Sequence, residues 1–260
     1  DGTLRLLIAN ISNHLDTIGG CLVSSDWQGP LRAEIEKALP GVCAWGMTSA
    51  SGNINHFDPN GGPDQSSYER CTAIGKGYAA ATLAAVPKLK DLPPGDLATA
   101  FRTIKVGTLE VPEEDIHEAR QTVAKYADLS FGSRNLTSED LANKAPIALK
   151  LFAQRLLDIV DNPRIYSMEC HVIRLGDFHI IGLCGEPFVE HAIYIREDIL
   201  RRRPCLISAH CAGEAGYIPN RYNFGRGGYE TQVTSSRTSL ETGNILRQTV
   251  AELVAQTAAK

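Results

Sequence analysis

Hydrophobic and polar positions along the chain predict strands and helices that follow one another in turn. Apolar runs predict buried strands, and an alternating pattern over 101–111 predicts a strand with one solvated face. Residues 164–186 predict two strands around a turn at Gly176-Asp177, which is a β-hairpin signal. The remaining strands are expected at 3–10, 42–50 and 204–210, and helices at 31–39, 68–88, 111–126, 138–160, 188–203 and 239–259.

This alternation of strands and helices predicts the fold class. Interleaved strands and helices are typical of α/β layering, and the hairpin argues against a purely parallel sheet. We therefore expect an α/β protein built as a layered mixed-sheet sandwich flanked by helices. The pattern contains no internal repeat and no convincing linker, so residues 1–260 are expected to form a single domain.

Charge and cysteine content narrow the class of protein. A formal charge of -4 excludes a generally basic nucleic-acid binder, and no apolar run approaches the ~20 residues of a membrane helix. The seven cysteines are scattered without a CxxC pair, which favours free thiols and a reducing, cytoplasmic compartment. The sequence does not fix the compartment, because the chain begins at Asp1 without Met. We expect a longer protein whose signal peptide, if it has one, lies upstream.

Polar residues gather in loops that follow the predicted strands, where α/β proteins build their sites. His14, in the loop 12–20, is either a metal ligand or general base, with Asp16 behind it, or a solvated loop histidine. Glu186 follows a buried strand, and a carboxylate there is costly unless it is paired or metal-bound. None of the common zinc motifs, such as HExxH, is present.

Two further loops leave similar alternatives open. His56 lies in the loop 51–62 and is either functional or simply hydrogen-bonded within the loop. Tyr217 and Tyr229 lie in the Gly-rich segment 211–230 and are either site residues or tyrosines that pack the loop. Local motifs alone therefore name no reaction.

The order of four segments resembles the neutral/alkaline (non-lysosomal) ceramidase family. RLGDFHIIGLCGEPFVEHAIYIRE is followed some thirty residues later by GYIPNRYNFGRGGYE, and the start IANISNHLDTIGG precedes SSDWQGPLRAEIE. The resemblance extends over essentially all 260 residues. Each motif is short and moderately specific by itself, and the order and spacing of the four carry the resemblance.

The resemblance implies a zinc-dependent hydrolase that cleaves an amide (N-acyl) bond by metal-activated water. His14, Glu186 and Tyr217 take the places of three protein ligands of one Zn²⁺ ion, and Tyr229 matches a tyrosine that stabilises the oxyanion at the substrate carbonyl. The first zinc histidine of the family belongs to an HTHSGP-like motif that is absent here. We therefore expect a missing N-terminal segment to complete the site.

Two departures from the family pattern affect the expected substrate. Asn55 stands where the ceramidases carry a serine, and His56 follows it, so Asn55 and His56 are expected to act at the catalytic site by shaping the substrate pocket, with His56 also a candidate acid or base. Asn cannot act as a nucleophile but can hydrogen-bond a substrate. The chain also ends without the immunoglobulin-like C-terminal domain of longer ceramidases, which suggests a shorter, bacterial-type relative.

Three functional hypotheses remain. The first is a ceramidase-like amidase of sphingolipid metabolism with a lipid-like or other small-molecule substrate. The second keeps the metal site but takes a polar or sugar-type substrate, because the Asn/His/Asp-rich loop suits hydroxyl groups and few aliphatic residues flank the loops. The third is a non-catalytic binding protein on the same fold. Zinc content and substrate screening would separate them.

Overall fold

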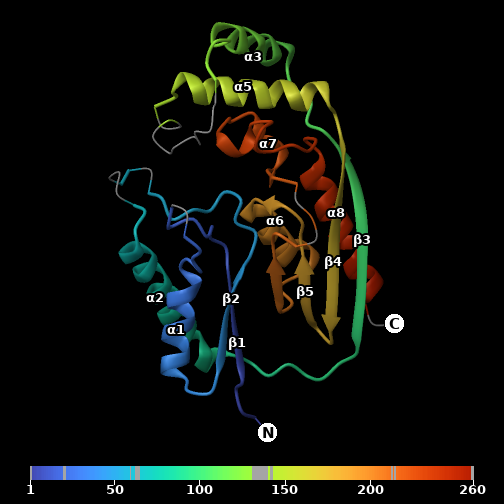
Figure 1. The fold of residues 1–260 in the computed structure, drawn as a ribbon. Coiled ribbons are helices and arrows are strands. Elements are labelled where there is room, and N and C mark those ends of the chain that lie inside the picture. Colours follow the sequence, from blue (N-terminus) through green and yellow to red (C-terminus); the bar gives the residue numbers. More distant parts are fainter. Residues whose placement is uncertain are drawn as a thin grey trace.

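The computed structural model describes residues 2–19, 22–58, 60–61, 65–130, 140, 143–211, 213 and 215–258. The predicted mixed α/β fold is confirmed. Figure 1 shows a smaller part built from β1, β2, α1 and α2 beside a larger part built on the strands β3, β4 and β5. Helices α3 and α5 lie together across one end of the molecule.

The smaller part is a parallel strand pair covered by two helices. β1 (Leu6–Ile11) pairs in parallel with β2 (Cys43–Thr48), and the connection between them contains α1 (Gln28–Ala38). α2 (Tyr68–Ala85) packs against α1 and begins where the Ser67 side chain accepts a hydrogen bond from the Arg70 amide. The buried apolar residues of this smaller part form one cluster: Leu7, Ala9, Trp27, Leu31, Ile35, Ala44 and Ala79.

A mixed four-stranded sheet forms the centre of the larger part, in the order β3-β4-β5-β7. β3 (Leu97–Gly107), β4 (Ile165–Leu175) and β5 (Phe178–Gly182) are antiparallel neighbours, and β7 (Cys205–Ser208) adds in parallel to β5. The predicted hairpin is confirmed, because Leu175 pairs with Phe178 across a two-residue loop in which Gly176 has φ 58°.

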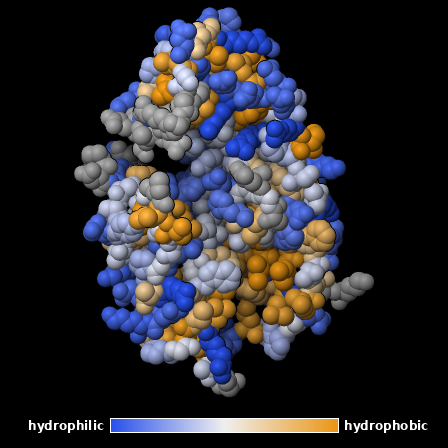
Figure 2. Space-filling view, viewed as in Figure 1, coloured by the Kyte–Doolittle hydropathy of each residue, from blue (hydrophilic) through white to orange (hydrophobic). Residues whose placement is uncertain are grey.

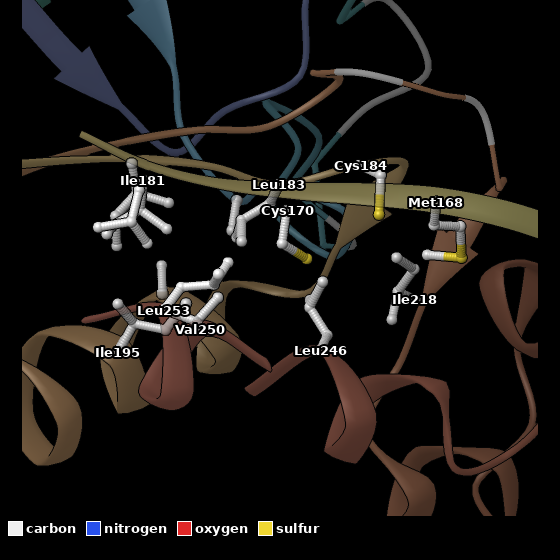
Figure 3. Packing of buried hydrophobic residues seen from close by; sticks show 14 of the residues in the cluster. Met168, Cys170, Ile181, Leu183, Cys184, Ile195, Ile218, Leu246, Val250 and Leu253 are labelled. Atoms are coloured by element: carbon white, nitrogen blue, oxygen red, sulfur yellow. The ribbon is translucent and has the colours of Figure 1, made fainter. Parts of the chain in front are cut away.

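One face of this sheet is buried by helices. α8 (Thr242–Thr257), α6 (Val189–Tyr194) and the π-helical turn η2 (Ile195–Ile199) cover it. Figure 3 shows Leu246, Val250 and Leu253 of α8 facing the sheet residues Ile181 and Leu183, and these side chains are buried. On the opposite face, Figure 2 shows apolar side chains gathered over the β4–β5 region. That face includes the exposed residues Leu97, Phe101, Ile173 and Leu175.

Two short strands and a helical cap complete the architecture. β6 (Glu186–Pro187) and β8 (Tyr217–Ile218) form a parallel pair. α3 (Glu113–Lys125) packs on α5 (Pro146–Asp161), and their sequences show why they start there: acidic residues fill the first turn of α3, and Pro146 occupies the first turn of α5. The short segments η1 (Val86–Lys88), α7 (Arg221–Phe224) and η3 (Tyr229–Thr231) are single turns.

Asn10 joins the two parts through its side chain. Its Nδ2 donates to the Ile207 carbonyl at 2.9 Å and to the Met47 carbonyl at 3.2 Å, while its Oδ1 accepts from the Ile207 amide at 3.0 Å. One amide therefore links β1, β2 and the outer edge of β7. The ends of β1 and β2 lie next to the larger part as a result.

Three predicted elements need correction. The helix expected over 188–203 ends early, because Arg201 and Arg202 have positive φ (49° and 63°) and form a turn beyond it. The helix expected over 138–160 begins at Pro146. Residues 143–145 are not helical, and the expected start at Ser138 lies outside the described residues. The strand expected from Phe101 begins earlier, at Leu97.

The cysteine prediction is partly correct. All six described cysteines are free thiols, and Cys71, Cys170 and Cys184 are buried. Cys43 is exposed, and Cys21 lies outside the described residues. None of the helices in the described part of the chain combines the length and hydropathy needed to cross a bilayer.

Candidate metal centre

Glu186 and Tyr217 are held opposite each other by the short parallel pair of β6 and β8. The two residues are register partners, and the Glu186 amide donates to the Gly216 carbonyl at 2.9 Å. Each follows a glycine in the left-handed region, Gly185 (φ 58°) and Gly216 (φ 67°). A Cβ on Gly216 would lie 2.2 Å from the Ser235 carbonyl oxygen, so glycine is required there. The glycines therefore aim both side chains to one side.

His14 reaches the same place from the smaller part. Its backbone amide donates to the Ile54 carbonyl at 3.1 Å, and its carbonyl accepts from the Trp27 indole N–H at 2.8 Å. His14 Nδ1 lies 4.0 Å from Glu186 Oε2, and the His14 ring centroid lies 6.0 Å from that of Tyr217. The structure thus brings the three predicted metal ligands together from the loop after β1 and from the short strands β6 and β8.

The loop 51–54 packs tightly against this centre. The Gly52 amide donates to the Pro187 carbonyl at 2.9 Å, and a Cβ on Gly52 would lie 2.3 Å from the Glu186 carbonyl oxygen. His14 Nε2 lies 3.4 Å from the Gly52 carbonyl oxygen. A proton on Nε2 directed at that carbonyl leaves the Nδ1 lone pair facing Glu186, which is the tautomer that a metal ligand needs.

Burial governs the protonation of Tyr217. Burial, followed by the negative charge of Glu186, raises the pKa of the Tyr217 phenol above its usual value near 10. The metal-free site therefore holds a neutral phenol beside the carboxylate. Its oxygen becomes a phenolate ligand only when a cation offsets the cost of ionisation.

These three side chains offer donor atoms of types that suit a zinc ion. Imidazole nitrogen, carboxylate oxygen and phenol oxygen are hard or borderline donors, and zinc holds such atoms at ~2.0–2.2 Å. Two ligands at that distance and a tetrahedral angle lie about 3.4 Å apart, a little closer than His14 Nδ1 and Glu186 Oε2 lie here. Among the described residues, no three His, Cys, Asp or Glu side chains lie close enough to share a metal, so the cluster depends on tyrosine.

Tyr229 extends the cluster toward solvent. Its ring centroid lies 6.0 Å from that of Tyr217 with the planes at 77°, and its side chain is exposed. The phenol is therefore available to a ligand that sits above Tyr217.

Asn55 and His56 meet the loop of His14 through Asp16. The Asn55 amide donates to Asp16 Oδ2 at 2.7 Å, and His56 Nδ1 lies 3.4 Å from Asp16 Oδ1. The His56 side chain is only 1% exposed. This contact places both residues next to the His14 loop, whereas their expected role as pocket residues stays a prediction.

Sequence reasoning did not single out the residues that anchor loop 51–54. Asn53 Oδ1 accepts from the Val189 amide at 2.8 Å, and Asn53 Nδ2 donates to Glu190 Oε2 at 2.9 Å. Glu190 Oε1 also accepts from the Tyr222 hydroxyl at 3.0 Å. These partners are far apart in sequence and no local motif connects them, although Asn53 lies in the Asn-rich loop that drew attention to Asn55.

One cleft borders the centre, and a second cavity lies apart from His14, Glu186 and Tyr217. A cleft of about 480 Å³ is lined by His14 together with Trp45 and His210. A second cavity of about 630 Å³ lies beneath α3 and α5 and is bounded by Gly228 and Thr231, on either side of Tyr229 in the sequence. Apolar residues of α5, including Phe152 and Leu156, line it. That few aliphatic residues flank the loops of the site stays a prediction, because this apolar lining does not include His14, Glu186 or Tyr217.

Fold and site together define an α/β protein with a candidate metal centre at the junction of its two parts. This is the fold of part of a neutral ceramidase. The crystal structure of neutral ceramidase from Pseudomonas aeruginosa matches with a TM-score of 0.65 and 15% identity, over 100% of this chain and 46% of that one. A ceramidase complexed with C2 matches with a TM-score of 0.66 and 16% identity, over 97% and 45%.

These matches confirm the ceramidase resemblance at the level of the fold. The chain spans about half the length of the two structures. No protein-family model and no curated protein matches it in sequence. What the whole ceramidases do is therefore a source of proposals for this chain.

Proposed function

We propose that this protein is a ceramidase-like hydrolase that uses a zinc ion held by His14, Glu186 and Tyr217 to cleave an N-acyl (amide) bond. The observation that carries the proposal is the convergence of these three side chains from one loop and two short strands. The ceramidase fold supports the reaction class, because those relatives are named for cleaving an amide. Three protein ligands leave the fourth position of a tetrahedral catalytic site open for the reacting water.

The chain's own residues would divide the work as follows. Glu186 and His14 fix the position of the ion, and the Gly52 carbonyl orients His14 from behind. A bound zinc ion would polarise the scissile carbonyl and lower the pKa of a water molecule to about 7. The exposed Tyr229 phenol donates a hydrogen bond to the carbonyl oxygen as negative charge develops there.

The cavity beneath α3 and α5 favours a lipid-like acyl chain as one substrate candidate. Its wall is apolar where α5 lines it, and its border runs along the segment that carries Tyr229. An acyl chain lying there would enter from the Tyr229 side of the centre. Hydrolysis of short-chain and long-chain N-acyl amides tests this idea, because the two kinds of substrate differ only in the apolar area that they bury.

Glu186→Gln tests the proposal directly. The amide keeps the size of the side chain but removes the charge that a zinc ligand needs, so zinc affinity should fall at least tenfold and N-acyl hydrolysis should disappear. Zinc content by elemental analysis and amine release from a panel of N-acyl amides are the measurements. Glu252→Gln is the matched control, because the Glu252 carboxylate on α8 pairs with Arg102 of β3 and its loss should leave both readouts unchanged.

A well-folded Glu186→Gln protein that still binds one equivalent of zinc would remove Glu186 from the ligand set. Zinc binding without hydrolysis of any N-acyl amide would instead favour the metal-bearing binding protein.

A further inference from the structure

The cleft on the His14 side of the centre has the features of a ligand subsite. It lies between the carboxyl ends of β2 and β7, which is where α/β proteins commonly bind ligands. Its volume of about 480 Å³ falls in the ~300–1,000 Å³ range of small-molecule sites. Because His14 forms part of its wall, a ligand in the cleft would lie directly beside the metal centre.

Backbone hydrogen bonds hold His210 at the cleft in a left-handed conformation. It has φ 55°, a region that few residues other than glycine adopt and in which asparagine, aspartate and histidine are the most common of those. Three hydrogen bonds fix it there: the Ala209 amide to the Thr48 carbonyl at 3.2 Å, the His210 amide to the Gly185 carbonyl at 3.1 Å, and the Cys211 amide to the Leu183 carbonyl at 2.9 Å. The imidazole is exposed and makes no hydrogen bond within the described part of the chain.

Trp45 supplies a flat apolar wall to the same cleft. It lies on β2 with 53% of its surface exposed, although the other tryptophan, Trp27, is completely buried. A large exposed indole beside a polar histidine suits a ring with an apolar face, such as the C–H face of a sugar, whose edge carries polar groups.

The cleft has a mixed apolar and polar lining that carries no formal charge. None of its lining residues is Asp, Glu, Lys or Arg, so it offers no partner to an ionic group. Its polar groups are uncharged donors and acceptors from Gln28, Thr48 and Ser208, apart from the two histidines. Gln28 Nε2 is fixed by a hydrogen bond to Thr48 Oγ1 at 3.1 Å, so this wall presents ordered hydrogen-bonding groups. Such a lining suits hydroxyl groups on a neutral ligand.

We propose that this cleft binds the neutral, hydroxylated ring of an N-acylated amino sugar, with the ring stacked on Trp45 and a hydroxyl group bound by His210. The proposal rests on the proposed function, since the N-acyl group would then lie at His14, Glu186 and Tyr217. It names the substrate class that the metal centre would act on.

Tryptophan fluorescence of the metal-free protein tests the cleft independently of catalysis. Only Trp45 is exposed, so N-acetylglucosamine should cause a saturable change in emission, and Trp45→Phe should abolish it. N-octylacetamide, which has the amide and a chain but no hydroxyl groups, should cause no saturable change. The proposal is overturned if N-acetylglucosamine causes no saturable change up to tens of millimolar, if the change persists in Trp45→Phe, or if only N-octylacetamide produces it.

Variants at His210 test its part in binding. His210→Gly keeps the backbone conformation and removes the imidazole, so the Kd for N-acetylglucosamine should rise about threefold to tenfold, the worth of one hydrogen bond. His210→Asn tolerates the same φ and retains a donor and an acceptor, so it should restore most of the affinity. An unchanged Kd in His210→Gly would remove His210 from the site.

The two proposals can fail separately. Saturable binding in a protein that binds no zinc at Glu186 would refute the proposed reaction and leave the cleft assignment standing. Zinc binding and amide hydrolysis without sugar binding would refute the cleft assignment and leave the proposed reaction standing.

Discussion

At the scale of single residues, His191 is a buried base that the fold keeps uncharged. Its side chain is fully buried on α6, and its Nε2 donates to the Ile218 carbonyl at 3.1 Å. Gly243 of α8 packs against the ring so closely that a Cβ there would lie 2.5 Å from Cε1. Burial, followed by the positive charge of Arg247, lowers the pKa of His191 from 6.5 to about 4.

This shift makes the stability of the protein depend on pH. Below pH 6.5 the unfolded chain takes up a proton at His191 that the folded chain refuses until about pH 4. Stability should therefore fall as the pH drops through that window, by up to about 3 kcal/mol from this group. Urea unfolding near pH 7 and pH 5 should show a smaller loss in His191→Gln than in the parent. The exposed His117→Gln is the control, and equal losses in all three proteins would refute the assignment.

At the scale of elements, the sequence predicts those helices and strands whose positions follow from the local spacing of apolar residues. The α8 helix is foreseen because its apolar residues recur at helical spacing, and the hairpin because Gly176-Asp177 sits between alternating strands. The sequence does not predict that the helix beginning with α6 ends early, because positive φ at Arg201 and Arg202 has no local signal in those residue types. Tertiary context decides that conformation.

The same distinction applies to the candidate site. His14, Glu186 and Tyr217 could be selected from the sequence because each lies beside a strand end in a family-like motif. Trp45, His210 and Asn53 could not be placed in the same way. Their place at the site depends on how β2, β7 and α6 come together in the fold. Residues this far apart in the sequence share no pattern from which their proximity could be predicted.

Helix α8 should carry much of the stability of the larger part. Leu246 is fully buried against the sheet, as Figure 3 shows, so Leu246→Ala leaves a cavity and should cost about 2–5 kcal/mol of unfolding free energy. Urea denaturation measures the loss. Gln256→Ala, at an exposed position of the same helix, should change stability by less than about 0.5 kcal/mol. Similar values for the two variants would mean that α8 is not packed as described.

At the scale of the whole molecule, the candidate centre draws its ligands from both parts. His14 belongs to the part with β1 and β2, whereas Glu186 and Tyr217 belong to the larger part. The two parts have separate hydrophobic clusters and are linked by Asn10 and by loop 51–54. An ion bound between them would therefore act as a further link.

Zinc should accordingly stabilise the chain against heat. A ligand that binds only the folded state at a hundred times its Kd adds about 2.7 kcal/mol, which corresponds to a rise in Tm of roughly 5–10 °C for a chain of this size. Differential scanning calorimetry with and without zinc measures the rise. Glu186→Gln should lose it and Glu252→Gln should keep it. An equal rise in Glu186→Gln would mean that zinc binds elsewhere.

The outer strand of the central sheet has a consequence for how the protein behaves at high concentration. Among the described residues, the eleven-residue strand β3 pairs with β4 alone, and it exposes Leu97 and Phe101 on the uncovered face. Its outer edge is a template onto which another extended chain can add, and its apolar side chains would strengthen that addition. Lys105 is exposed on the same strand and opposes stacking of like strands by charge repulsion, whereas the charge of Arg102 is offset by Glu252 of α8. Resistance to aggregation should therefore rest in part on Lys105 and weaken as salt screens it.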